Sequence, residues 1–302
     1  MPMQMRAGEI GSLAAEGLRD VLGGILGGSP ITDYAEAEPL DWEVLRDGGW
    51  DELGVPEEAG GAGASLRDLT EVALAWGAYC APSPLIETIL AKRWSAAARD
   101  QAGPVTVAVP AVGGGAVAPF GAVARVLSGL GAGPDGFLDP PQGLADAFAL
   151  TLRPVPCAIP TVFADEAARE LAVLWAAEGV GAARRCLLDA VEYAKGRKQF
   201  GVPIGSFQAI KHRAAHTLEL TERAETAVLW AAADSYTEGA ESIGTRRLLL
   251  HALSTSQEVV ESCIQIHGGM GFTWEMGVHV YLRHVITLRE FVDELLPGAT
   301  AG

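Results

Sequence analysis

The sequence has few cysteines, few basic residues and no long apolar run. Its cysteines lie far apart without a C-x-x-C pair, which argues against a disulfide framework and against a zinc site. No stretch of about 18 residues is apolar throughout, and the N-terminus lacks a basic region followed by an apolar run. We therefore expect neither a membrane span nor an export signal, and we expect a cytoplasmic protein. The four cysteines are Cys80, Cys157, Cys186 and Cys263.

The shortage of basic residues gives the chain a net charge of −16, because 22 Lys and Arg stand against 38 Asp and Glu. Non-specific binding to nucleic acid or anionic lipid needs a broad cationic surface, so we expect neither partner. Any anionic ligand must be bound by a local cluster of cations. The 302 residues, 49% of them apolar, are enough to bury a sizeable core.

The middle of the chain lacks Trp and Tyr between Pro104 and Phe163 and has no helical stripe. Its Val, Gly and Pro with period-two fragments predict a small β segment at 103–163. The flanking regions, 1–102 and 164–302, have helical patterns, and four long helical runs with short connections predict an antiparallel C-terminal bundle. The predicted helices are 8–27, 40–50, 65–80 with Ser65 and Asp68 at its N-cap, 85–100, 164–198, 206–237, 240–267 and 276–295.

One stretch contradicts the acidic composition. From Arg184 to Arg213 there are seven Lys or Arg against Asp189 and Glu192. A break with the sequence "FGVPIG" lies inside this basic region, and its Gly and Pro residues alone would explain a plain turn between two helices.

The residues around this break also suit a dinucleotide. The guanidinium of Arg197 can bind a pyrophosphate through two hydrogen bonds, and the ring of Phe200 can cover an adenine. The amide of Gln199 can bind a ring edge or a ribose. Lys198, Phe207 and Gln208 lie beside them in the sequence. The spacing of these residues does not decide between a plain turn and a ligand site.

A second candidate cluster is "CIQIHGGMGFTWE", Cys263 to Glu275. Gly268 and Gly269 have no Cβ, so a ligand could approach their backbone amides closely, although a plain helix C-cap is the alternative. His267 beside them is interpreted as a packed histidine. His212 and His216 have i,i+4 spacing without the glutamate of an H-E-x-x-H motif, so we expect no metal. Three tryptophans are predicted to be core residues: Trp175, Trp230 and Trp274.

Together these motifs resemble the acyl-CoA dehydrogenase family. The stretch "YAKGRKQFGVPIGSFQAIKH" is similar to Y-x-x-x-R-x-Q-F-G-x-P-I-x-x-F-Q-x-I-x-H of that family. About 50 residues later, "QIHGGMGFTWE" is similar to Q-x-x-G-G-x-G-F/Y-x-x-E, and the N-terminal "GVPEEAGGAG" resembles P-E-x-x-G-G-x-G. The resemblance implies a mostly α fold with an N-terminal helical domain (1–102), a reduced β middle segment (103–163) and a C-terminal four-helix bundle (164–302).

The resemblance also implies FAD bound between subunits and oxidation of an acyl-CoA thioester to its 2,3-enoyl form. In that reaction a carboxylate removes the α proton and the flavin accepts a hydride, and electron-transfer flavoprotein is a candidate acceptor. The bundle of one subunit would contact the adenosine and pyrophosphate of a shared FAD. The positions that carry over are Arg197, Gln199, Phe200, Phe207, Gln208, Gln265, Gly268 and Gly269.

The chain departs from the family at its catalytic carboxylate. Counting nine residues beyond Arg283 gives Val292, with Asp293 next, inside what is predicted to be continued helix. The position used by other relatives falls on Leu171, beside Glu170. Asp293 and Glu170 are therefore the two candidate bases. The middle segment, with about 60 residues, is also too short for a full β-barrel that lines the flavin ring.

These departures favour a shortened subunit of a heteromeric bacterial acyl-CoA dehydrogenase, such as a heterotetramer, whose homologous partner holds the flavin ring and the base. Bacterial relatives of this type act on bulky CoA thioesters, including sterol side chains. Two alternatives stay open: a structural subunit that binds no flavin, and a self-sufficient homo-oligomer that uses Glu170 or Asp293.

Overall fold

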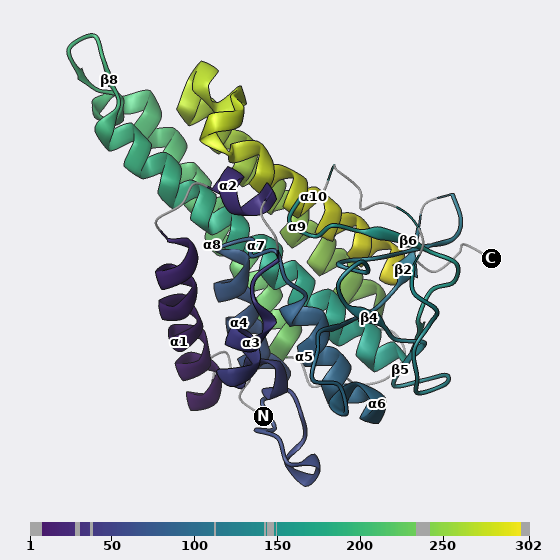
Figure 1. Cartoon of the computed structure of the whole chain (residues 1–302). Helices are drawn as coiled ribbons and strands as arrows, with labels where there is room; N and C mark the ends of the chain where they lie inside the picture. The colour runs from purple at the N-terminus through teal and green to yellow at the C-terminus, as the bar shows by residue number, and fades with distance from the viewer. Residues whose placement is uncertain are drawn as a thin grey trace.

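The computed structural model describes residues 8–27, 31–36, 39–111, 113–141, 143, 148, 150–233 and 242–296. These residues form a mostly helical molecule in which N-terminal helices and a small β region lie against a long helical bundle (Figure 1). One end of the bundle extends beyond the rest of the molecule. The predicted fold class is confirmed, whereas the three domain boundaries stay a prediction.

Four N-terminal helices begin within two residues of their predicted starts, at Glu9, Trp42, Leu66 and Leu85, whereas the helix Ile31–Glu36 was not predicted. At the start of α4, the Ser65 hydroxyl accepts the Asp68 backbone N–H, and the Asp68 carboxylate accepts the Ser65 N–H, which confirms the predicted cap. The helix predicted over 85–100 is interrupted at Ser95, whose backbone is extended and whose side chain caps a new short helix. The helices are α1 (Glu9–Leu26), α2 (Ile31–Glu36), α3 (Trp42–Asp47), α4 (Leu66–Gly77), α5 (Leu85–Trp94) and α6 (Ala96–Arg99), with short 3₁₀ turns η1 (Trp50–Glu52) and η2 (Glu57–Ala59).

The middle segment contains only short strands. One antiparallel sheet has the order β2-β3-β6, with Val109 opposite Val117 and Val117 opposite Pro156. Two further pairs, β1 with β4 and β5 with β7, are parallel. The strands are β1 (Val105–Thr106), β2 (Val109–Pro110), β3 (Ala116–Ala118), β4 (Arg125–Val126), β5 (Gly129–Leu130), β6 (Val155–Cys157) and β7 (Val162–Phe163).

The bundle consists of α7 (Asp165–Gly196), α8 (Gln208–Ala233), α9 (Ser242–His267) and α10 (Val278–Leu295). These bounds agree with the four predicted helices, and the predicted break "TEGAES" lies largely outside the described residues. A hairpin of β8 (Lys198–Gln199) and β9 (Val202–Pro203) joins α7 to the 3₁₀ turn η3 (Ile204–Ser206) and then to α8. Two more 3₁₀ turns, η4 (Gly268–Phe272) and η5 (Trp274–Met276), join α9 to α10.

The N-terminal helices and the bundle meet where α4 packs against α7. A Cβ added to Gly181 would lie 2.2 Å from the Leu74 carbonyl oxygen, and one added to Gly77 would lie 1.9 Å from the Glu178 carbonyl oxygen. The two helix backbones are therefore in direct contact, which only glycine allows at these positions.

A group of polar side chains is buried close to this contact. The Glu87 carboxyl group of α5 accepts a hydrogen bond of 2.8 Å from the Trp175 indole. Glu178 of α7 lies 3.1 Å from His284 of α10, and Thr151 of the middle segment bonds the other nitrogen of His284 at 2.7 Å. All three parts of the chain thus contribute to one buried polar cluster.

The tryptophan predictions are only partly right. Trp175 is fully buried in the core, but Trp230 and Trp274 are 48% and 46% exposed. The prediction was wrong for Trp230 because a substantial part of the α8 surface is exposed in this chain. It was wrong for Trp274 because this residue lies in η5, where one part of its ring packs on His279, with ring centroids 4.3 Å apart, and the rest is exposed.

In the part of the chain that the structure describes, no helix is long and apolar enough to cross a membrane. Among the same residues no group of three or more His, Cys, Asp or Glu is placed to hold a metal ion. The cytoplasmic location stays a prediction.

Candidate functional site

The hairpin at the tip of α7 presents an aromatic ring in a strained backbone position. Phe200 and Gly201 form its two-residue loop, and both have positive φ, at 52° and 83°. Such loops favour Asn-Gly, and a bulky residue in this conformation is uncommon and strained. Phe200 is nevertheless 93% exposed, with only an edge contact to Phe207 at 6.2 Å. Strain and exposure at one residue make Phe200 a candidate for a functional role.

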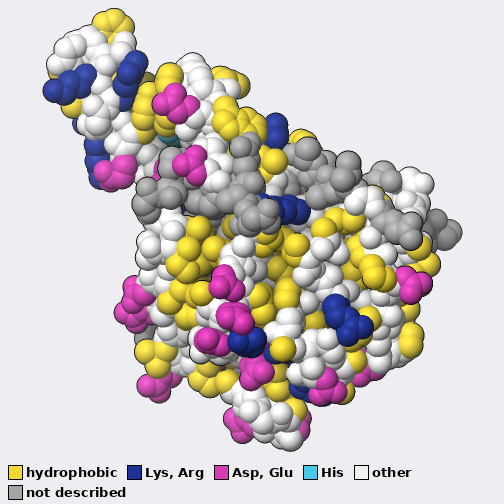
Figure 2. All heavy atoms as spheres, viewed as in Figure 1, with side chains coloured by type: hydrophobic (Ala, Val, Ile, Leu, Met, Phe, Trp, Pro, Cys, Tyr) yellow, Lys and Arg dark blue, Asp and Glu magenta, His cyan; other side chains and the backbone are white. Residues whose placement is uncertain are grey.

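The basic region divides into paired and unpaired cations. Arg184 binds Glu222 and Glu225, Arg185 binds Asp189, and Lys195 binds Glu192. Figure 2 shows Lys and Arg side chains gathered at the tip where Figure 1 places the hairpin. Four cations at this end form no ion pair within the described residues, and all four are exposed: Arg197, Lys198, Lys211 and Arg213.

Backbone hydrogen bonds fix the base of this hairpin. The Arg197 N–H donates to the Tyr193 carbonyl at 2.8 Å, and the Ile204 N–H donates to the Arg197 carbonyl at 2.7 Å. The Gln199 side chain is exposed and bonds the Lys198 carbonyl. Gln208 begins α8 and bonds the His212 ring at 2.8 Å. The predicted residues of this motif are therefore close together on one tip.

The second motif lies at the C-terminal end of α9. Gly268 has a φ of 62°, and a Cβ added to Gly268 or Gly269 would meet no atom within 4 Å. Their backbone is thus open to an approaching ligand. Gln265 is exposed one turn earlier. Gly271 instead packs tightly, since its Cβ would lie 2.6 Å from the Ile264 carbonyl oxygen.

His267 connects this motif to the hairpin. It is buried, as predicted, and its Nδ1 lies 2.8 Å from the Cys263 carbonyl oxygen. Its ring packs on the Tyr193 ring, with centroids 4.5 Å apart and planes at 33°. Both predicted clusters therefore lie at the same end of the bundle, and neither sequence motif alone revealed this contact, because Tyr193 and His267 are far apart in the chain.

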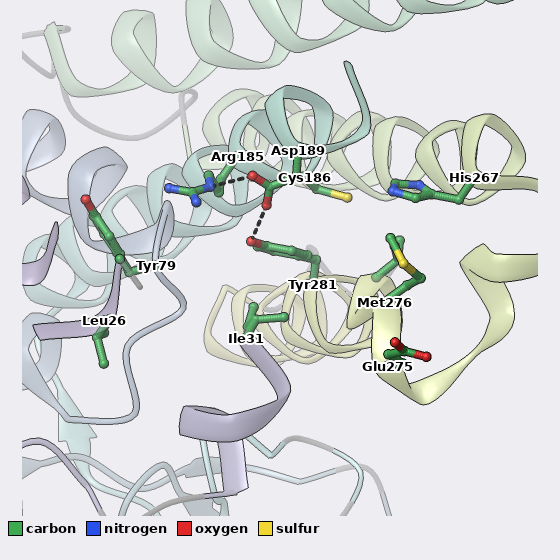
Figure 3. Close-up of a pocket in the computed structure, with 12 residues that line it drawn as sticks. Leu26, Ile31, Tyr79, Arg185, Cys186, Asp189, His267, Glu275, Met276 and Tyr281 are labelled. Carbon is green, nitrogen blue, oxygen red and sulfur yellow. Dashed lines mark hydrogen bonds and ion pairs between the residues drawn. The ribbon is translucent and has the colours of Figure 1, made fainter. Parts of the chain in front are cut away.

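His267 is also one of the residues that line a cavity of about 230 Å³ (Figure 3). The Asp189 carboxylate lies along its wall and accepts hydrogen bonds from Tyr281 at 3.0 Å and from Arg185 at 2.9 Å. Met276 and Ile31 contribute apolar surface. The sequence did not predict this cavity, because its lining comes from segments at both ends of the chain.

Both candidate bases are occupied by cations. Glu170 is buried, and a single oxygen, Oε2, accepts from Arg93 Nε at 2.9 Å and from the Trp94 indole at 2.7 Å. Asp293 is paired with Arg246 on α9.

The structure also explains why the counted base position is apolar. The helix α10 runs without a break from Val278 to Leu295, and Val292 faces its buried side. The predicted continuation of the helix is confirmed.

Arg93 and Trp94, the partners of Glu170, line an open groove of about 400 Å³ beside the Pro56–Gly63 loop.

Comparison with known proteins identifies the family of this chain. Residues 164–291 match the family model described as acyl-CoA dehydrogenase, C-terminal domain. Acyl-CoA dehydrogenase IpdE2 of Mycobacterium tuberculosis is 38% identical over 250 residues, which cover 76% of this chain and 75% of that protein. The chain belongs to the acyl-CoA dehydrogenase family, which is a family of oxidoreductases.

Solved structures show the same fold. The ChsE4-ChsE5 complex from Mycobacterium tuberculosis contains a chain with a TM-score of 0.70 at 19% identity, covering 97% of this chain and 96% of that one. A Tcur3481-Tcur3483 steroid ACAD gives a TM-score of 0.70 at 23% identity, covering 96% of this chain and 95% of that one.

Proposed function

We propose that this chain is one subunit of an FAD-dependent acyl-CoA dehydrogenase, and that it provides the adenosine-pyrophosphate side of an FAD site shared with a homologous partner subunit. The observation that carries the proposal is the exposed tip, where unpaired cations, a strained aromatic residue and an open Gly-Gly backbone lie together. This end of the molecule suits an anionic ligand that bears an aromatic ring.

The residues present fit one half of FAD. Arg197 and Lys198 offer cationic donors for a diphosphate, and Phe200 offers a ring face for adenine. The open backbone at Gly268 and Gly269 admits a close approach. The middle segment offers strands of two or three residues without Trp or Tyr, which does not fit a role in covering the flavin ring.

The state of the two candidate carboxylates supports a base from the partner. FAD, when bound, supplies the acceptor for the hydride in the 2,3-dehydrogenation of an acyl-CoA. Proton removal needs a carboxylate within hydrogen-bond reach of the substrate. In this chain Glu170 is held by Arg93 and Trp94, and Asp293 is held by Arg246. We infer that the partner subunit contributes the base.

The names of two similar solved structures support a proposal for the substrate class. Each of the two solved structures above is named for two different proteins, ChsE4 with ChsE5 and Tcur3481 with Tcur3483. The second is called a steroid ACAD. We propose a bulky or sterol-derived acyl-CoA as the substrate and electron-transfer flavoprotein as the electron acceptor.

Co-expression tests the assembly. The chain is purified alone and together with a homologous acyl-CoA dehydrogenase encoded beside it, and FAD per complex is measured by absorbance. We expect FAD in the pair and little in the chain alone. A flavin-containing, active homo-oligomer of this chain would contradict the shared site, and a stable pair without FAD would indicate a structural subunit.

Arg197→Ala tests the site itself. A charge-assisted hydrogen bond contributes about 1.5 to 3 kcal/mol, so its loss should weaken FAD retention by the complex about ten-fold or more. The affinity is measured by flavin fluorescence during dilution. Arg223→Ala is the matched control, because Arg223 is an exposed α8 residue paired with Glu219. Equal FAD retention in both variants would contradict the proposal.

A further inference from the structure

We propose that the stacked rings of Tyr193 and His267 are a positioning pair that sets the Arg197 hairpin and the Gly268–Gly269 turn at the correct separation for one ligand. The inference rests on the proposed function, since it concerns how the two halves of that site are held. Neither residue is among those expected to contact FAD.

On one side, His267 is fixed to the Gly-Gly turn. It is the last residue of α9 and directly precedes Gly268. Its Nδ1 bonds the Cys263 carbonyl at 2.8 Å, so the ring cannot swing freely. The turn folds back onto it, because a Cβ on Gly271 would lie 3.0 Å from the His267 Cβ. The position of this ring therefore defines the position of the turn.

On the other side, Tyr193 is fixed to the hairpin. Its carbonyl accepts the N–H of Arg197, and the Arg197 carbonyl in turn accepts the N–H of Ile204. The following turn also packs on this end of α7, because a Cβ on Gly205 would lie 3.0 Å from the Ala194 carbonyl oxygen. Any displacement of Tyr193 is transmitted to Arg197 through the backbone.

The ring contact between Tyr193 and His267, with centroids 4.5 Å apart, joins the hairpin to the Gly-Gly turn. Offset aromatic pairs have a preferred geometry, and a ligand that binds both halves gains affinity if their separation is already correct. Within the described residues the Tyr193 hydroxyl forms no hydrogen bond, so the flat ring is the part of the side chain that carries this role.

The first experiment compares two variants in the complex with the partner subunit. Tyr193→Leu removes the flat ring, and we expect FAD retention to fall about three- to ten-fold, the range of an aromatic pair. Tyr193→Phe keeps the ring and should stay within about two-fold of the parent. Thermal unfolding of each variant without FAD serves as the folding control. Equal losses in the two variants, or no loss in Tyr193→Leu, would overturn the inference.

A double-mutant cycle separates positioning from general destabilisation. If Tyr193 acts through Arg197, Tyr193→Leu should cause a much smaller loss of FAD affinity, below about two-fold, when Arg197→Ala is already present. The same fold loss in both backgrounds would contradict positioning. If Arg197→Ala alone leaves FAD retention unchanged, the proposed function fails, whereas a loss in Arg197→Ala without a loss in Tyr193→Leu contradicts only this inference.

Discussion

Glu87 is a carboxyl group that the fold keeps out of water beside a second carboxylate. Burial, and then the charge of Glu178, raise the pKa of Glu87 to about 8 from its ordinary value of 4.5, against the opposing effect of the Trp175 hydrogen bond. The folded chain therefore retains a proton near neutral pH that the unfolded chain releases. By linkage, the free energy of unfolding falls as pH rises from about 4.5 to about 8.

Glu87→Gln should remove this pH dependence while keeping an oxygen that accepts from Trp175. We expect the variant to gain stability relative to the parent as pH rises through the window, by at most about 1.4 kcal/mol per pH unit. Urea unfolding at pH 5, 6, 7 and 8 measures the difference. Glu16→Gln, at an exposed residue of α1, is the control for the substitution itself. A constant difference for Glu87→Gln would contradict the assignment.

Single residues were the hardest to predict from sequence. The basic region and the Gly-Gly turn could be recognised because their residues are consecutive, and the structure brings them to one end of the bundle. The ion pairs of Glu170 with Arg93 and of Asp293 with Arg246 join distant segments and leave no local pattern. The exposure of Trp230 was missed for a related reason, since an apolar residue on a helix does not reveal which face will lack a neighbour.

At the scale of whole elements, periodicity and caps were reliable guides. The four bundle helices and the Ser65–Asp68 cap follow from local signals. Ser95 shows the limit: it lies within a helical pattern, yet its hydroxyl and the following amides bind Asp135 in the middle segment, which stabilises a break. Contacts between segments decide such positions, and a single sequence does not show them.

The contact between α4 and α7 gives a prediction at this scale. Gly181→Ala would place a methyl group 2.2 Å from the Leu74 carbonyl oxygen, so the helices must separate, and overpacking of this kind lowers the free energy of unfolding by about 1 to 3 kcal/mol or more. The control is Gly24→Ala in α1, where an added Cβ meets no atom within 4 Å and should stabilise the helix by up to about 1 kcal/mol. Urea unfolding measures both. Equal effects would show that the two helices can move apart freely.

The whole molecule has one exposed tip that assembly is proposed to cover. Trypsin cleaves after Lys and Arg, and both Arg197 and Lys198 are exposed in this chain. We expect limited trypsin treatment to cut the isolated chain at the hairpin and to leave the complex with partner and FAD intact there. Mass spectrometry identifies the cleavage sites. The same cleavage rate in the chain and in the complex would indicate that this end does not lie at the interface.

The length of α7 has an electrostatic consequence. Its 32 residues extend about 48 Å at 1.5 Å per residue, and the hairpin and the start of α8 beyond its C-terminal end carry the unpaired cations, while the chain as a whole is strongly acidic. The molecule is therefore a large electric dipole. An approaching anion is repelled over most of the surface and attracted at one pole, so its orientation is selected before any contact forms.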